Sequence, residues 1–173
     1  MKILVAHASR MGSTAEIARH IAAQLSGAGH DVDTSPCAQA PGADGYDAVL
    51  LGSALYIGRW DKSALRYLSA QATQLTGRRT WLFQSGPCGE GAEAEDVATP
   101  RAVRRLSRQI GLAPPVTFGG RLERARTTTW LGRWLATGAY AGDFRDWNQV
   151  TAWTNGVEGQ LAGGRQGAAS PTA

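Results

Sequence analysis

Residues 2–14 of the chain, Lys-Ile-Leu-Val-Ala-His-Ala-Ser-Arg-Met-Gly-Ser-Thr, contain the clearest structural pattern in the sequence. The apolar run at 2–6 predicts a short buried strand, and the polar stretch Ser9–Thr14 predicts a turn. Isoleucine and leucine residues then recur at a spacing of four, which predicts a helix over 14–27. Because strand, turn and helix together form the first half of a β-α-β unit, this stretch favours an α/β fold.

The rest of the chain continues the alternation of strands and helices. Further strands are expected near Val32 and over 47–51, 80–84 and 116–118, and further helices over 61–75, 100–110 and 147–161. A helix between the second and third strands is expected to be short or absent. This order predicts a doubly wound α/β sandwich, with a five-stranded parallel sheet and helices on both faces.

Two residues are expected to cap helices, and the composition sets broader limits. Ser13, with Glu16 three positions later, fits a capping box for the first helix, and Asp146 is a candidate N-cap for the last. The 173 residues suit one domain over 1–162, and the Gly/Ala/Ser/Pro-rich stretch 163–173 is expected to be disordered.

Charge and cysteine content bear on location and partners. No run approaches the roughly 20 apolar residues of a membrane span, so a cytoplasmic location is expected. The two cysteines have no metal-ligand spacing, so free thiols and no metal site are expected. The net charge of +4 favours anionic partners without naming one.

The turn Ser9–Thr14 is a candidate anion site. Three hydroxyl groups and a glycine surround the start of a helix, where backbone N–H groups are free to bind an anion. The turn lacks both the GxGxxG of a dinucleotide fold and the GK[ST] of a P-loop. Neutral hydroxyl donors instead suit a terminal phosphate monoester. The alternative is an ordinary capped helix with a polar turn.

Three loops, each directly after a strand, together resemble those of flavodoxins. They are the Ser-x-x-Gly-x-Thr pattern at Ser9–Thr14, the stretch Gly52–Trp60 and the stretch Ser85–Gly91. The resemblance implies a flavodoxin-like domain that binds one FMN, with the phosphate on the first loop and the flavin ring between the second and third. The implied FMN ligands are Ser9, Met11, Gly12, Ser13, Thr14, Ser53, Ala54, Leu55, Tyr56, Ile57, Gly58, Ser85, Gly86, Pro87, Cys88 and Gly89.

Individual side chains of the second loop have alternative interpretations. Tyr56 or Trp60 could stack on the flavin, whereas Trp60 could equally pack against the start of the second helix. Arg59 could bind a substrate carboxylate or be an ordinary surface charge. No catalytic acid or base can be identified from the sequence.

Within this family the chain is most similar to the branch of menaquinone-dependent protoporphyrinogen oxidases. The similarity lies in Gly52–Gly58, in Phe118–Leu122 and in an Arg/Trp-rich insert before a helix that opens with Asp146-Trp147. It implies an FMN-dependent oxidoreductase that passes electrons between a porphyrinogen- or quinone-like partner and FMN. The alternatives are a flavodoxin-type electron-transfer protein and a flavin reductase of a specialised pathway. The basic charge counts against a carrier that docks on basic reductases.

The insert at about 121–145 is predicted to contain an amphipathic basic helix. Trp130 and Trp134 lie four apart, as do Leu131 and Leu135, so in a helix they would form one apolar stripe. Such a helix could rest on the inner face of a membrane or cover a lipophilic substrate; the alternatives are core packing and a homodimer interface. A small-molecule or quinone substrate or a redox partner protein is expected, and nucleic acid is not.

Overall fold

The computed structural model describes residues 1–86, 97–122 and 142–166, with side chains up to 163. In chain order its strands and helices are β1 (Lys2–Ala8), α1 (Ser13–Gly27), β2 (Asp31–Pro36), the short 3-10 helix η1 (Ala43–Gly45), β3 (Ala48–Tyr56), β4 (Arg59–Trp60), α2 (Lys62–Ala70), α3 (Ala72–Leu75), β5 (Arg79–Ser85), α4 (Arg101–Ile110), β6 (Val116–Phe118), β7 (Arg121–Leu122), β8 (Gly142–Asp143) and α6 (Trp147–Gln166).

The five main strands form one parallel sheet, as predicted, and their order in the sheet is β2-β1-β3-β5-β6. The chain passes from β1 to β2 in one direction and then to β3 on the other side of β1. Strand order therefore reverses around β1 and β3, and ligands of open α/β sheets bind beyond the carboxyl ends of strands at such a point. The loops after β1, β3 and β5 all lie at this edge.

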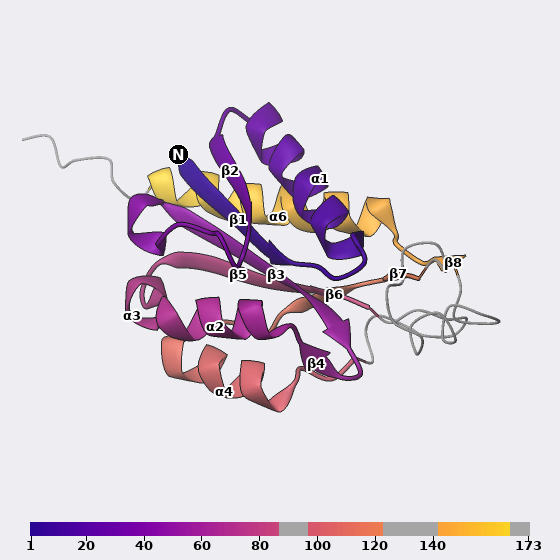
Figure 1. Ribbon diagram of the computed structural model, residues 1–173. Coiled ribbons are helices and arrows are strands. Elements are labelled where there is room, and N and C mark those ends of the chain that lie inside the picture. The colour runs from indigo at the N-terminus through magenta and orange to yellow at the C-terminus, as the bar shows by residue number, and fades with distance from the viewer. Residues whose placement is uncertain (87–96, 123–141, 167–173) are drawn as a thin grey trace, which may run out of the picture.

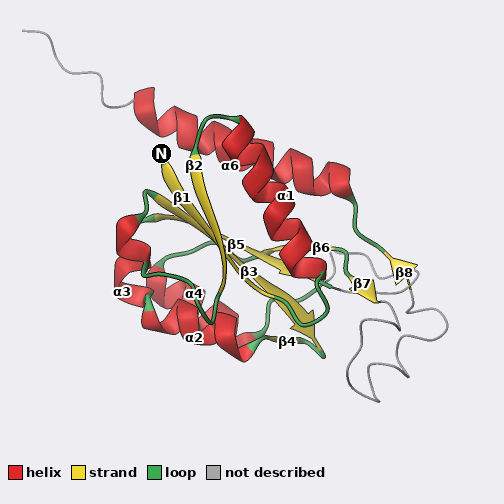
Figure 2. Ribbon diagram, turned by 45° about the horizontal axis from the view of Figure 1, so that its top comes forward, coloured by secondary structure: helices red, strands yellow, loops and turns green. Residues whose placement is uncertain are grey.

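Helices cover both faces of the sheet (Figures 1 and 2). On one face α1 and α6 bury side chains such as Ile17 and Leu161 against Ile3 and Val5 of β1. On the other face α2, α3 and α4 pack against the alternate residues of the same strands, such as Leu4 and Leu51. The strands are apolar on both faces because both faces are buried.

Two features of the chain differ from the sequence-based predictions, and a third agrees with them. The third strand does not end at Leu51 but runs on to Tyr56 and turns back as a hairpin with β4. The helix predicted over 61–75 is divided at Gln71, whose side-chain oxygen accepts the Ala43 N–H at 2.8 Å and thereby holds the β2–β3 connection. That connection contains only the 3-10 helix η1, which agrees with a short or absent helix.

The helix ends are capped in two different ways. At α1 the capping-box prediction is wrong: the N-cap is Gly12, and Ser13 is already the first helical residue. At α6 the prediction holds, because an Asp146 carboxylate oxygen accepts the N–H groups of Asn148 (2.8 Å) and Gln149 (3.2 Å). Over the described residues, none of the helices combines the length and the apolar character that a bilayer crossing would require.

Candidate functional site

The β1–α1 turn is shaped by a glycine in the left-handed region. Gly12 has φ of +89°, which an L side chain rarely adopts, and its N–H donates to Ser9 Oγ at 3.1 Å. The turn thereby directs the start of α1 toward the carboxyl edge of the sheet. N–H groups in the first turn of a helix have no carbonyl partner within the helix, so they face this edge as free donors.

Thr14 places a polar atom in this turn that no described residue satisfies. Its side chain is fully buried, and its Oγ1 has no hydrogen-bond partner among the described residues. A buried hydroxyl without a partner costs about 1–3 kcal/mol in proteins. The cost would be removed by an acceptor bound at the helix start, which is the arrangement expected of a phosphate site.

The third loop lies directly against the first and second. Ser13 Oγ and Ser85 Oγ are 3.1 Å apart and form a buried hydrogen bond between the start of α1 and the end of β5. Gly86 has φ of +124°, donates its N–H to the Phe118 carbonyl at 3.0 Å, and lies so close to Leu55 that a Cβ would come 3.1 Å from its carbonyl oxygen. The structure therefore brings parts of all three predicted loops together.

The second loop is a tight β-hairpin. Its two-residue turn, Ile57-Gly58, has φ of +50° and +66°, which is typical of a type I′ turn. Ile57 is 71% exposed, although it is large and apolar. A β-branched residue with positive φ is a strained outlier, and such strain gathers at binding sites.

The hairpin is fixed to the sheet by buried polar contacts. The Trp60 indole N–H donates to Gln84 Oε1 at 2.8 Å, and Gln84 Nε2 donates to Thr117 Oγ1 at 3.0 Å. Ser53 Oγ accepts the Asp61 N–H at 3.0 Å. Trp60 is therefore a core residue, which agrees with packing against the second helix and not with stacking on the flavin. Tyr56 is the aromatic side chain of this loop left for stacking on a ligand.

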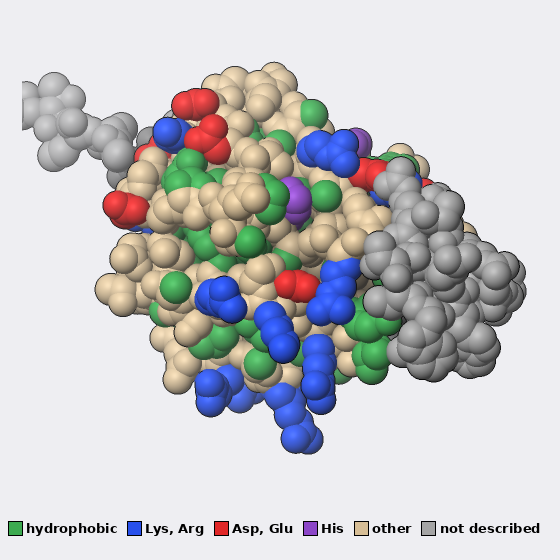
Figure 3. Space-filling model, viewed as in Figure 1, with side chains coloured by type: hydrophobic (Ala, Val, Ile, Leu, Met, Phe, Trp, Pro, Cys, Tyr) green, Lys and Arg blue, Asp and Glu red, His purple; other side chains and the backbone are tan. Residues whose placement is uncertain are grey.

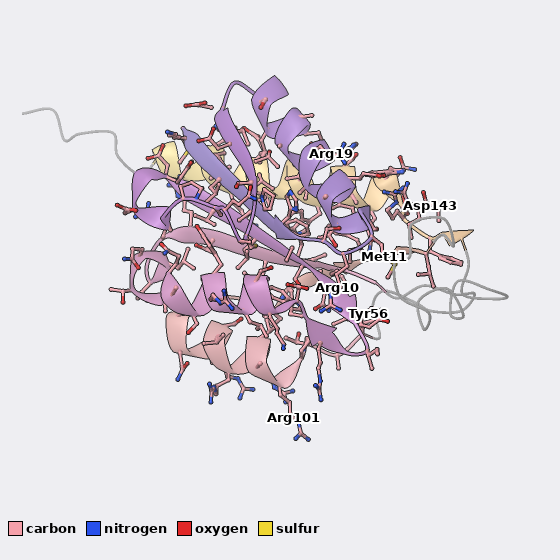
Figure 4. The ribbon with its side chains drawn as sticks, viewed as in Figure 1. Arg10, Met11, Arg19, Tyr56, Arg101 and Asp143 are labelled. Atoms are coloured by element: carbon pink, nitrogen blue, oxygen red, sulfur yellow. The ribbon has the colours of Figure 1, made fainter. Side chains whose placement is uncertain are left out.

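Arg10, to which the sequence assigned no role, links the first loop to the second (Figure 4). Its Nε donates to Asp61 Oδ2 at 3.0 Å, and its guanidinium lies 5.3 Å from the centre of the Tyr56 ring. Burial raises the pKa of Asp61, but hydrogen bonds from Ser63 and Arg10 outweigh it and lower that pKa overall. The Asp61 carboxylate also caps α2.

A second group of charges lies at the start of α1. Glu16 accepts hydrogen bonds from Arg121 at 2.6 Å and from Arg145 at 2.7 Å, and Arg145 also makes a two-point contact with Asp143. The partners of Glu16 lie 105 and 129 positions away in the sequence. No local pattern could have indicated this cluster, because its members share no motif.

Of the remaining predicted site residues, some lie at the carboxyl edge of the sheet and others lie outside the described residues. Met11 lies in the β1–α1 turn beside Arg10 (Figure 4). Ala54 is half-buried near the end of β3. Pro87, Cys88 and Gly89 lie outside the described residues, as do Trp130, Leu131, Trp134 and Leu135 of the Arg/Trp-rich insert. At the two ends of that insert, Arg121 and Arg145 are almost buried, with side chains 10% and 3% exposed. No group of three or more potential metal ligands lies together in the described parts of the chain.

Comparison with known proteins agrees with this fold. The model of the flavodoxin domain family matches residues 4–130. No curated protein matches the chain at a significant level. Among solved structures, the flavodoxin of Streptococcus pneumoniae TIGR4 is 16% identical with a TM-score of 0.59, covering 94% of this chain and 99% of its own. Flavodoxin 2 of Bacillus cereus is 20% identical with a TM-score of 0.57, covering 91% and 96%.

Rubredoxin oxygen:oxidoreductase from Desulfovibrio gigas contains a similar fold within a longer chain. It is 15% identical with a TM-score of 0.55, and the match covers 93% of this chain but 37% of that one. These identities establish a shared fold. Since the family model covers most of the chain, and the strand order and loop positions agree with it, this protein belongs to the flavodoxin domain family.

Proposed function

We propose that this protein is a flavodoxin-type electron-transfer protein that holds FMN at the carboxyl edge of its sheet. FMN is the cofactor that membership of the flavodoxin domain family implies. In this proposal the phosphate binds at the β1–α1 turn, and the flavin ring lies between the β3–β4 hairpin and the loop after β5. The single observation that carries the proposal is the buried Thr14 hydroxyl without a partner at the start of α1.

The residues present fit a phosphate monoester without a charged partner. The turn offers the Ser9 and Thr14 hydroxyls and the free N–H groups of the first helical turn. The nearest arginine of the turn, Arg10, is paired with Asp61. Recognition would thus rest on neutral donors and the helix dipole, as the sequence predicted.

The chain would position the ring through its rigid hairpin. FMN supplies reversible electron transfer when it is bound. The hairpin keeps its place because Trp60 and Ser53 tie it to the sheet, so Tyr56 and Ile57 would meet the ring without rearrangement. Gly86, which has no side chain, lets the backbone at the end of β5 lie close against Leu55 of β3.

The charges at the site support a carrier rather than acid–base catalysis. Arg10 is engaged by Asp61, and Glu16 by Arg121 and Arg145, so each of these charges stabilises the fold. Oxidation of protoporphyrinogen with menaquinone as the acceptor remains a second candidate. It rests on the similarity of Gly52–Gly58 and Phe118–Leu122 to that branch of the family.

One experiment tests both candidates. The purified protein is denatured to identify its flavin, and the FMN-loaded protein is incubated with protoporphyrinogen, with and without menaquinone. The carrier proposal expects one FMN per chain and no multiple turnover. Catalytic oxidation that depends on menaquinone would favour the second candidate, and a chain that binds no FMN would overturn both.

A further inference from the structure

Helix α4 presents a row of arginines to solvent. Val103, Ser107 and Ile110 are buried, which fixes the opposite side of the helix outward. That outward side carries Arg101, Arg104, Arg105 and Arg108, all exposed.

The neighbouring elements extend this positive charge. Helix α2 contacts α4 and exposes Lys62 and Arg66, and the hairpin exposes Arg59. We call the surface of these seven residues the basic face (Arg59, Lys62, Arg66, Arg101, Arg104, Arg105 and Arg108). None of the seven forms an ion pair with another described residue. The described elements α2, α3, α4 and β4 contain no acidic residue, and Asp61, which caps α2 and also lines the pocket beside it, is paired with Arg10. Figure 3 shows the blue side chains gathered over α2 and α4.

The basic face accounts for the positive charge of the whole protein. The chain has 18 basic and 14 acidic residues, so without these seven the acidic residues would outnumber the remaining 11 basic ones. Four of the acidic residues belong to 87–96, outside the described residues. Among the described residues, the excess positive charge is thus concentrated on one surface.

Folding alone does not favour this arrangement. Arg101 and Arg105, like Arg104 and Arg108, are like charges four positions apart on one helix, which destabilises it. Arg101 also places a positive charge at the positive end of the helix dipole. Because the arrangement lowers the stability of the helix, we infer that these arginines serve to bind an anionic ligand.

A pocket lies where the basic face meets the candidate flavin site. It has a volume of about 780 Å³ and lies between the hairpin and the first turn of α4. Leu65 and Val103 contribute apolar surface, while Arg59, Lys62 and Arg101 bring positive charge to it. Tyr56 and Ile57 line the same pocket, so an occupant would lie beside the predicted place of the flavin ring.

We propose that the basic face and this pocket form the docking surface for an acidic redox partner protein. Carboxylates of the partner pair with the arginines, and an apolar side chain of the partner enters the pocket. The redox role of the partner rests on the proposed function, whereas docking of an acidic protein at the basic face does not.

The shape of the surface favours a protein over a bilayer or a nucleic acid. A flat bilayer cannot fill a concave pocket, and the basic face has only Ile57 as a large apolar side chain exposed among its described neighbours. Single-stranded nucleic acids bind through several exposed aromatic rings, whereas on this surface Trp60 is buried and Tyr56 is half-buried. An apolar pocket ringed by charge is the usual anatomy of a protein interface.

The test measures binding by the full-length protein, with and without FMN, of a plant-type [2Fe–2S] ferredoxin, an acidic protein used as the probe. We expect binding that weakens steadily with added salt. The double variant R104E/R108E should bind about tenfold more weakly. The control R19E reverses one exposed arginine on α1, far from the basic face, and should bind within about twofold of the wild type (Figure 4).

A third variant and two further probes separate the possible occupants. Ala102→Trp fills the pocket without changing charge, and it should weaken ferredoxin binding but leave the binding of a single-stranded RNA oligonucleotide unchanged. The proposal is overturned if ferredoxin does not bind, as expected if residues 87–96 neutralise the face, or if R19E has the same effect as R104E/R108E. Tighter binding of RNA or of phosphatidylglycerol vesicles than of ferredoxin at equal salt also overturns it. Binding is measured without FMN as well. If the proposed function fails, the chain still binds ferredoxin but does not bind FMN; if the docking proposal fails, the chain does not bind ferredoxin whether or not FMN is present.

Discussion

At the scale of single residues, removing the Thr14 hydroxyl should have opposite effects on the stability of the protein and on its affinity for FMN. Replacing it with valine keeps the side-chain shape and removes the buried hydroxyl. Without FMN, Thr14→Val should stabilise the protein by about 1 kcal/mol, because a polar atom without a partner is lost. FMN affinity should fall roughly 10- to 150-fold, since a hydrogen bond to a charged acceptor is lost. Denaturant unfolding and flavin-fluorescence titration measure the two effects.

Riboflavin is the matched control for Thr14→Val, because it has the same ring and no phosphate. Its affinity should be equal for the wild type and the variant. If the variant loses affinity for riboflavin as well, or keeps its affinity for FMN, Thr14 is not a phosphate ligand.

Glu16 should make the free energy of unfolding depend on pH in the acidic range. Burial raises the pKa of Glu16, but hydrogen bonds from Arg145 and Arg121 outweigh it and lower that pKa below its ordinary value of 4.5. The folded state thus binds the proton less readily than the unfolded chain. The stabilisation is complete above about pH 4.5 and is lost as the pH falls through the lowered value.

The variant Glu16→Gln isolates this contribution. At pH 7 it should be less stable than the wild type by roughly 1.5–3 kcal/mol, because hydrogen bonds to a charged group are replaced by weaker ones. At pH 3 the difference should shrink. Denaturant unfolding at both pH values is the measurement, and a difference that stays constant with pH would show that the carboxylate charge is not what Glu16 contributes.

At the scale of elements, the β3–β4 hairpin carries strain that can be released. Asn-Gly is the preferred pair for a type I′ turn, so Ile57→Asn should raise the melting temperature by roughly 2–6 °C. If the Ile57 side chain contacts the flavin ring, FMN binding should weaken severalfold at the same time. Gly58→Ala is the contrasting variant and should lower the melting temperature. An unchanged FMN affinity in Ile57→Asn would remove Ile57 from the predicted site.

Elements with a continuous apolar pattern could be predicted from the sequence, and those held by distant contacts could not. The strand at 2–6 and the helix after it are local patterns of apolar residues. The hairpin was missed because Ile57 is not a residue that usually adopts positive φ. The division of the helix at Gln71 was missed because the apolar spacing continues through it, and the contact of the Gln71 side chain with Ala43, 28 residues away, leaves no local signal.

The candidate site shows the same division. The glycine and hydroxyls of Ser9–Thr14 indicate an anion site because the chemistry lies within six neighbouring residues. The pairing of Glu16 with Arg121 and Arg145 depends on the folded chain, so the sequence offered no signal for it.

At the scale of the whole molecule, FMN should stabilise the fold as a unit. At a free FMN concentration of 100 times Kd, binding adds about 2.7 kcal/mol, which corresponds to a rise in melting temperature of roughly 5–11 °C. FAD and riboflavin at equal concentration should give smaller shifts, since the turn fits a terminal phosphate. Differential scanning fluorimetry compares the three, and a larger shift with FAD would contradict the choice of FMN.

The pairing of β7 with β8 also has a consequence for how such a protein can diversify. Arg121 lies opposite Asp143, and a Cβ on Gly119 would overlap the carbonyl of Phe144, so the chain leaves and rejoins the fold at one place. The stretch 123–141 therefore connects two chain ends, β7 and β8, whose positions are fixed by their pairing. A gene could lengthen, shorten or exchange it in a single recombination event and leave the sheet and α6 unaltered. New partner specificities could be acquired on this framework without a new fold.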